Sequence, residues 1–195
     1  MDGNTTHRAR GNRRKGKSLV AAVRHNWPVI RFVLLAAVAL LGIYYVLHLR
    51  WVAHHFVGPY TGFVAACSRA VLRVFGVSAG GSGEVIISPQ FGVTIKNVCN
   101  GLEVTAIYFA AVLAFPASWK HKLLGLAIGF PLIFAVNIVR VAVLFVLGYK
   151  VPHVFETAHY YYAQAFVIIA TVGIWLAWVT TYSAYGSKTR HRVPD

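Results

Sequence analysis

Three side chains in this 195-residue chain have the chemistry needed for acyl transfer: Cys99, Arg140 and His159. A cysteine thiol is a strong nucleophile at neutral pH once a neighbouring group takes its proton or favours its thiolate. A histidine can take that proton and return it to a leaving amine. An arginine is always charged and can donate hydrogen bonds to a developing oxyanion. A nucleophile, a base and an oxyanion donor together indicate acyl transfer.

Four further residues lie beside these three and could support them. Gly101 would let a substrate backbone approach the thiol closely. Glu156, three residues before the histidine, could orient its imidazole. Asn100 and Asn137 are polar partners next to the thiol and the arginine.

Each of the three main residues also has a plainer interpretation. A cysteine at a membrane edge can be a small apolar filler, and Cys67 and Cys99 could pair as a disulfide in an oxidising compartment. An arginine inside an apolar helix is costly and therefore indicates function. That function could also be a channel lining or a contact with lipid headgroups. The alternative to an enzyme is a small transport or assembly subunit that uses Arg140 to bind an anionic ligand.

The composition excludes a soluble enzyme. Hydrophobic residues make up 57% of the chain and charged residues only 12%, with a net charge of +14, whereas about a quarter of a soluble domain is charged. Disorder is excluded because it requires low hydrophobicity. We predict basic cytoplasmic tails at 1–28 and 184–195 around an integral membrane domain at 29–183. The tails are expected to contact anionic lipids, and no partner nucleic acid is expected.

The fold class that we predict is an all-α polytopic membrane protein. Four segments are apolar enough to form transmembrane helices, which need roughly 20 residues each: 29–47, 102–115, 123–147 and 160–182. Pro131 predicts a kink in the third. Four spans place Lys120, Lys122 and both basic tails on the cytoplasmic side, as the distribution of positive charge favours.

Two segments between the first and second spans do not fit a transmembrane helix. Segment 56–77 contains Arg69 and Arg73, four residues apart and therefore on one helix face, which favours an interfacial or re-entrant helix. Segments 84–87 and 92–96 predict a short extracytoplasmic hairpin. This hairpin is either a structural loop or a surface to which an extended peptide could add as a strand.

The three main residues are expected at one depth in the membrane. Arg140 follows Lys122 by eighteen positions, which is about 27 Å of helix, and the hydrocarbon core is about 30 Å thick. Arg140 therefore lies near the surface at which Cys99 precedes the second span and His159 opens the fourth. The three can meet only if their helices pack together.

The sequence around these residues resembles a known family. The run from Ile95 to Glu103, then Phe115-Pro116, Asn137 to Arg140, and His159 are similar to the exosortase/archaeosortase family, most closely the short exosortase H type. The resemblance covers about 85–181. Its longer members have about eight helices, and this chain has room for roughly half that number.

The resemblance implies a membrane-embedded cysteine transpeptidase of the prokaryotic plasma membrane, with its active site on the extracytoplasmic side. Such enzymes process proteins that carry a C-terminal sorting signal, which is a short motif, a transmembrane helix and a basic cluster. It implies that Cys99 is the nucleophile, Arg140 the family's arginine, and His159 the third site residue. The expected partners are membrane-anchored substrates and lipids, and the oligomeric state is open. No cofactor or metal is expected, because His48, His54 and His55 provide no paired ligands on two helices.

Overall fold

The computed structural model describes residues 24–190 and is mostly helical. Three helical segments are long and apolar enough to cross a membrane. These are α2 (Trp27–His48), α6 (Trp119–Lys150), and the segment Pro152–Thr181. The last comprises α7 (Pro152–Thr157), a π-helical turn η3 (Ala158–Tyr162) and most of α8 (Ala163–Arg190). The predicted all-α membrane fold is confirmed, while residues 1–23 and 191–195 of the predicted tails lie outside the described residues.

The second predicted span is a shorter helix. Helix α5 (Leu102–Ala114) has 13 residues, which is about 20 Å, less than the thickness of the hydrocarbon core. It ends before Phe115, whose extended backbone is the conformation that a following proline favours. More than half of its residues are buried, and it packs against α2, α6 and α8. Its apolar surface therefore forms part of the protein core.

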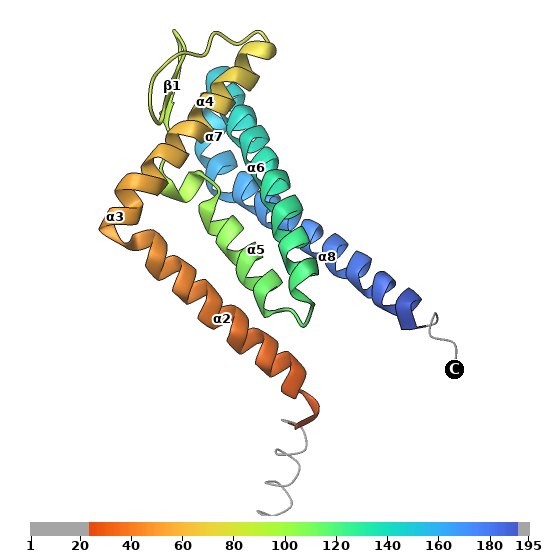
Figure 1. Ribbon diagram of the computed structural model, residues 1–195. Coiled ribbons are helices and arrows are strands. Elements are labelled where there is room, and N and C mark those ends of the chain that lie inside the picture. The colour runs from red at the N-terminus through yellow and green to blue at the C-terminus, as the bar shows by residue number, and fades with distance from the viewer. Residues whose placement is uncertain (1–23, 191–195) are drawn as a thin grey trace, which may run out of the picture.

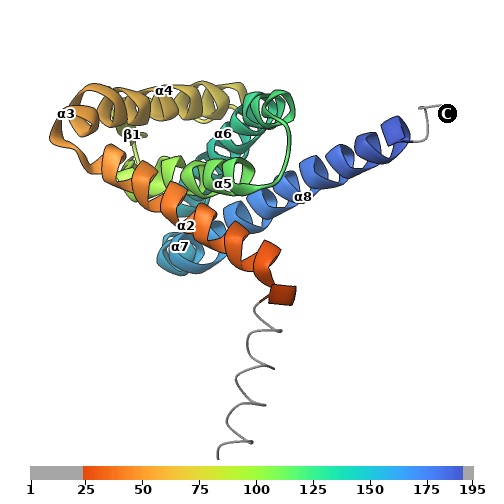
Figure 2. The same ribbon diagram turned by 60° about the horizontal axis from the view of Figure 1, so that its bottom comes forward.

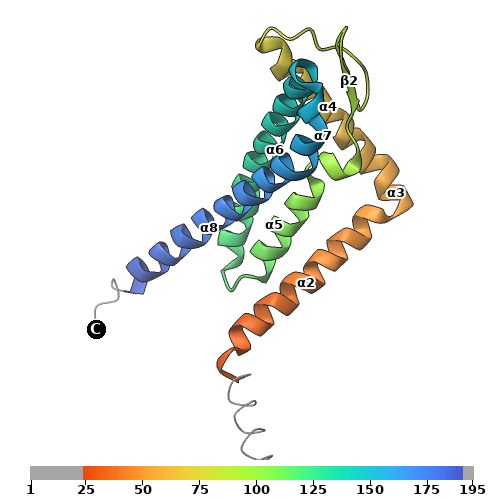
Figure 3. The ribbon, with the colours of Figure 1, turned by 180° about the vertical axis from the view of Figure 1, so that it is seen from behind.

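The four apolar helices alternate in direction (Figures 1 and 3). The start of α2, the α5–α6 turn and the end of α8 all lie toward one end of the molecule. The first turn of α6 is joined to α8, because Trp178 Nε1 donates to His121 O at 3.1 Å. The hairpin, α4 and α7 lie at the opposite end. Because of this alternation, the residues that precede α5 and the residues that follow α6 lie at that second end of the molecule.

Segment 56–77 forms a helix that crosses this second end. The chain continues from α2 through α3 (Arg50–Val52) and a π-helical turn η1 (Ala53–Val57) into α4 (Gly58–Val74), which lies across one side of the bundle (Figure 2). Helix α4 is not among the described helices long and apolar enough to span a membrane. This agrees with the predicted interfacial or re-entrant helix. Its buried side chains pack on α6.

The two arginines predicted to share a face of α4 hold the hairpin. Arg69 donates to Val85 O at 2.7 Å and to Gly83 O at 3.2 Å. Arg73 donates to Ala79 O at 2.8 Å. The arginine pair therefore satisfies backbone carbonyls of β1 and of the loop that leads into it.

The predicted hairpin is confirmed. Strands β1 (Val85–Ile87) and β2 (Gly92–Thr94) are antiparallel, and a bridge from Gly80 to Ile87 covers the other edge of β1. The buried side chains of this hairpin join the core cluster formed with α4 and α6. The hairpin is thus a packed part of the fold, and its second strand leads directly to Cys99.

The third and fourth helices begin earlier than predicted. Helix α6 starts at Trp119 and continues through Pro131 to Lys150, and the fourth helical segment starts at Pro152 instead of residue 160. His159 therefore does not open the fourth helix, as we expected, but lies inside its π-helical turn. Pro152 occupies the first turn of a helix, where proline is well tolerated, and this signal was missed.

Candidate active site

Cys99 lies on a short 3-10 turn, η2 (Asn97–Cys99), between the hairpin and α5. The chain then turns sharply at Gly101, whose φ of +85° is in the left-handed region that favours glycine. A Cβ at Gly101 would lie 2.8 Å from Cγ of Asn137. The space that we had assigned to a substrate backbone is therefore filled by Asn137, and Gly101 serves the turn that presents the cysteine.

Asn100 fixes the start of α5 and is fully buried. Its Oδ1 accepts from the backbone N–H of Leu102 at 2.9 Å, which satisfies one of the free donors at the helix start. Its Nδ2 donates to Thr61 Oγ1 on α4 at 2.9 Å. Asn100 is thus a positioning residue between α4 and α5. Thr61 was missed, because nothing in the sequence links it to Asn100.

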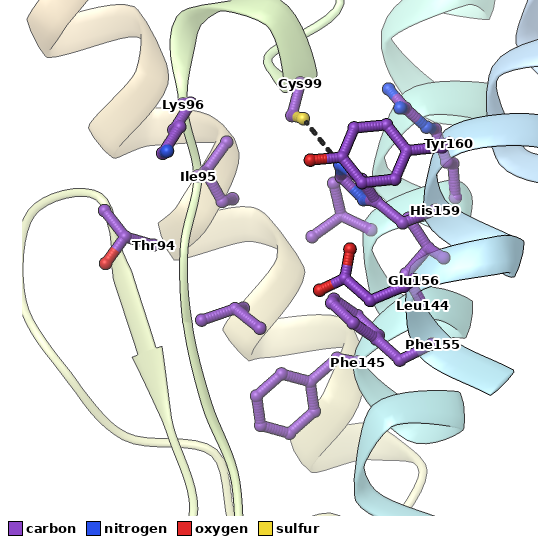
Figure 4. A pocket seen from close by; sticks show the side chains of 13 residues that line it. Thr94, Ile95, Lys96, Cys99, Leu144, Phe145, Phe155, Glu156, His159 and Tyr160 are labelled. Atoms are coloured by element: carbon purple, nitrogen blue, oxygen red, sulfur yellow. Dashed lines mark hydrogen bonds between the residues drawn. The ribbon is translucent and has the colours of Figure 1, made fainter. Parts of the chain in front are cut away.

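The thiol and the imidazole meet. Cys99 Sγ lies 3.5 Å from His159 Nε2, a distance at which the thiol donates to an unprotonated ring nitrogen (Figure 4). His159 reaches this position from the π-helical turn η3, and such turns often occur at functional sites. The thiol and the imidazole are therefore within hydrogen-bond distance of each other, which the sequence alone left open.

The imidazole is held by aromatic rings. The ring of Phe155 stacks on that of His159 at a centroid distance of 5.7 Å, one helical turn earlier. Phe155 in turn contacts Phe91 in the hairpin turn at 5.3 Å. The hairpin thereby positions the histidine through an aromatic contact that we did not predict from sequence.

Arg140 is buried beside this pair, with 5% of its surface exposed. Its two terminal nitrogens donate to Asn137 Oδ1 at 3.5 Å and to Gln164 Oε1 at 3.2 Å. Asn137 also donates to Cys99 O at 3.5 Å and so bridges the cysteine segment to the arginine. Arg140 Nε is buried and has no hydrogen-bond partner within the described part of the chain. A buried donor without a partner is costly, which is a reason to look for a ligand.

The three residues line one cavity of about 440 Å³. This volume is within the usual range for a small-molecule or peptide site. The remaining wall comes from the hairpin, α6 and α7 (Figure 4). The complete lining is Val93, Thr94, Ile95, Lys96, Cys99, Arg140, Val141, Leu144, Phe145, Phe155, Glu156, His159 and Tyr160.

Burial raises the pKa of the Cys99 thiol, and the Arg140 guanidinium opposes part of that rise. The resting thiol is therefore mostly protonated at neutral pH, and attack requires a proton acceptor. His159 is the group in hydrogen-bond distance for that role. Glu156 lines the same cavity. Among the described hydrogen bonds none joins Glu156 to His159, so no direct contact supports the orienting role that we predicted for it.

Gln164 is the polar neighbour that we missed. It lies five positions after His159, and in a regular helix of 3.6 residues per turn those two side chains would face different directions. The wider π-helical turn changes this register, so that His159 meets Cys99 while Gln164 meets Arg140. The sequence offered one signal for this role, because Gln164 is a polar residue in the otherwise apolar start of α8.

Within the described residues, no group of three or more His, Cys, Asp or Glu side chains is arranged to hold a metal ion. Both cysteines are free thiols, so the structure contains no Cys67–Cys99 disulfide. The cavity brings together a thiol, an imidazole and a guanidinium.

Comparison with known proteins shows the family of this chain. A family model described as transmembrane exosortase, of the EpsH type, matches residues 19–176. Because the match covers most of the chain, the protein belongs to the exosortase family and is a multi-pass membrane protein. Members of this family are in general membrane proteases or transpeptidases. Searches of curated proteins and of solved structures found no significant match to this chain.

Proposed function

We propose that this exosortase is a cysteine transpeptidase that cleaves the C-terminal sorting signal of exported, membrane-anchored proteins through a thioester. The observation that carries the proposal is the 3.5 Å approach of Cys99 Sγ to His159 Nε2 beside the buried Arg140. Family membership supports the general reaction class. In this proposal the chain lies in a prokaryotic plasma membrane and the cavity opens on the extracytoplasmic side.

In the first half of the reaction, the Cys99 thiol gives its proton to His159 and its sulfur attacks the carbonyl carbon of the scissile peptide bond. Arg140 donates to the resulting oxyanion, and its Nε–H supplies a donor that no described residue accepts from. The C–N bond then breaks as His159 returns the proton to the leaving amine. The products are a thioester on Cys99 and a released C-terminal fragment.

In the second half, an acceptor opens the thioester. His159 takes a proton from the incoming amine or water, and the acceptor attacks the thioester carbon. The C–S bond breaks and the sulfur regains a proton from His159. The product is either a transferred protein or a hydrolysed one, depending on the acceptor.

The test is processing of a co-expressed candidate substrate from the same genome. We choose an exported protein that ends in a short motif, a transmembrane helix and a basic cluster, and measure its intact mass. Wild-type enzyme is expected to remove the C-terminal fragment, and Cys99→Ala is expected to leave the substrate full length. Cys67→Ala is the matched control, because it removes the second free thiol of the chain, on α4.

The two variants separate the proposal from a general loss of folding. Both are expected to accumulate in the membrane at wild-type levels, and Cys67→Ala is expected to process normally. Normal processing by Cys99→Ala would end the proposal. If instead only Arg140→Gln lost function, an anion-binding role in transport or assembly would be favoured.

A further inference from the structure

The second strand of the hairpin has one edge that is not paired. In an antiparallel ladder, successive residues direct their N–H and C=O groups alternately toward the partner strand and away from it. Ile95 N donates to Glu84 O and Ser88 N donates to Phe91 O. With the observed register, residues 91, 93 and 95 therefore face β1, whereas Gly92, Thr94 and Lys96 face outward.

The outward groups differ between the two strands. On β1 they are satisfied, because Ile87 exchanges hydrogen bonds with Gly80 and Val85 O accepts from Arg69. On β2, no described residue forms a backbone hydrogen bond with the N–H or C=O of Gly92 or Thr94. All three outward-facing residues of this edge are exposed. Unpaired groups of this kind are a template for another strand.

This edge runs along the candidate active site. Four consecutive residues, 93–96, line the cavity that contains Cys99. Since consecutive side chains of a strand point to opposite faces, a cavity over one face would be lined by every second residue. Lining by all four indicates that the cavity lies alongside the strand, at its free edge (Figure 4).

The ladder ends beside the thiol. Lys96 still has an outward N–H, but its carbonyl already accepts from Cys99 N at 2.8 Å. A peptide paired to this edge would therefore lose its partner groups at Lys96. Its next residues would leave the strand at η2, where Cys99 lies.

We propose that the segment of the substrate next to the cleaved bond binds as an added third strand on the free edge of β2. The inference rests on the proposed function for the identity of the peptide. Main-chain hydrogen bonds to Thr94 and Lys96 supply the binding, and the cavity walls supply the selection of side chains. The substrate is accordingly read in an extended conformation, and its alternate residues face β2.

The first test uses synthetic peptides that span the residues upstream of the transmembrane helix of the co-expressed candidate. Single N-methyl groups are placed at each amide in turn, and binding to the Cys99→Ala enzyme in lipid nanodiscs is measured. Only every second N–H of an added strand faces β2, so affinity is expected to fall at alternate positions, by roughly fivefold or more. An equal effect at all positions, or none at any, would overturn the inference.

The second test changes the enzyme. Thr94→Pro removes an outward N–H that the hairpin does not use, and proline is tolerated at such edge positions. Thr94→Val is the matched control, because it changes the side chain but keeps the N–H. Thr94→Pro is expected to weaken binding of the unmethylated peptide roughly fivefold or more, while Thr94→Val binds like the parent enzyme.

The outcomes are distinct from those of the proposed function. Binding to Cys99→Ala needs no cleavage, so an alternating pattern would support the added strand even if processing failed. Equal binding by Thr94→Pro and Thr94→Val would contradict it. A second result would also contradict it, namely a Thr94→Pro protein whose mass in light scattering differs from that of the parent while its peptide affinity does not. The free edge of β2 in the parent would then pair with a second copy of the chain. If Thr94→Pro does not fold, the N-methyl series decides alone.

Discussion

Among single residues, Arg140 has the largest effect on the chemistry of the candidate site. A buried arginine is costly, and such residues in membrane helices usually have a functional role. Asn137 and Gln164 hold its two terminal nitrogens, which leaves Nε as the free buried donor. The same guanidinium opposes the rise in the Cys99 pKa that burial causes. In the mechanism that we propose, Arg140 therefore acts on the Cys99 thiol before it acts on an oxyanion.

This dual role predicts a pH effect on the thiol. The rate at which Cys99 is alkylated depends on the fraction of the side chain present as thiolate, so this rate should rise with pH. The pH at the midpoint of the rise should lie above about 8.5, the pKa typical of a free cysteine. In Arg140→Gln the opposing charge is lost, the pKa rises further, and the midpoint should move to higher pH. Mass spectrometry of the protein in a Cys67→Ala background measures the extent of Cys99 alkylation at each pH.

Arg31→Gln is the control for that experiment, because it removes a positive charge on α2 that is not among the residues lining the cavity. It should leave the midpoint unchanged. A midpoint in Arg140→Gln equal to or below that of the parent would contradict the assigned role of the arginine.

At the scale of elements, the site depends on short irregular segments at the ends of regular ones. Gly101 makes the turn between η2 and α5 in the left-handed region, and Asn137 on α6 packs against it. The π-helical turn η3 delivers His159 and leaves Gln164 facing Arg140. Through these segments, residues of the hairpin, η2, α6, α7 and η3 line one cavity.

We expect Gly101→Ala to destabilise the protein. The left-handed conformation costs a residue with a side chain roughly 1–2 kcal/mol, and the new Cβ would also press on Asn137. Thermal unfolding in detergent should show a lower midpoint. Gly42→Ala is the matched control, because its Cβ meets nothing within 4 Å, and alanine in a helix should be neutral or stabilising. Equal midpoints for the two variants would contradict this reading of the turn.

These elements also show what could be read from sequence. Hydropathy predicted the long helices, and the Arg69 and Arg73 spacing separated α4 from them. The spacing of Lys122 and Arg140 predicted the depth of Arg140, because helical rise is fixed, and Cys99 and His159 were expected at helix starts on the same surface. The π-helical turn and the contacts of Gln164 and Phe155 could not be predicted, because they depend on tertiary packing. For the same reason, the space beside Gly101 was assigned to substrate when Asn137 fills it.

At the scale of the whole molecule, the alternating helices separate two ends. Lys120 and Lys122 lie in the first turn of α6, beside the α5–α6 turn at one end of the molecule, and the hairpin, which is followed by Cys99 on η2, lies at the other (Figure 1). Positive charge favours the cytoplasmic side. The arrangement therefore supports our proposal that the cavity faces the extracytoplasmic side.

A labelling experiment tests this orientation. In intact cells expressing the Cys67→Ala protein, a small membrane-impermeant thiol reagent should modify Cys99 through the cavity. In a protein without either native cysteine, Ser118→Cys places the single thiol at the exposed α5–α6 turn, and it should react only after the membrane is permeabilised. The reverse pattern would place the site in the cytoplasm.

The most direct test of the central claim is the covalent intermediate itself. Wild-type enzyme mixed with the candidate substrate is quenched in acid, digested and examined by mass spectrometry for an acyl group on the Cys99 peptide. The proposed mechanism predicts an adduct that carries the new C-terminus of the cut substrate, is released by hydroxylamine, and is absent in Cys99→Ala. Cleavage at the same bond by Cys99→Ala, or an adduct on a different residue, would contradict it.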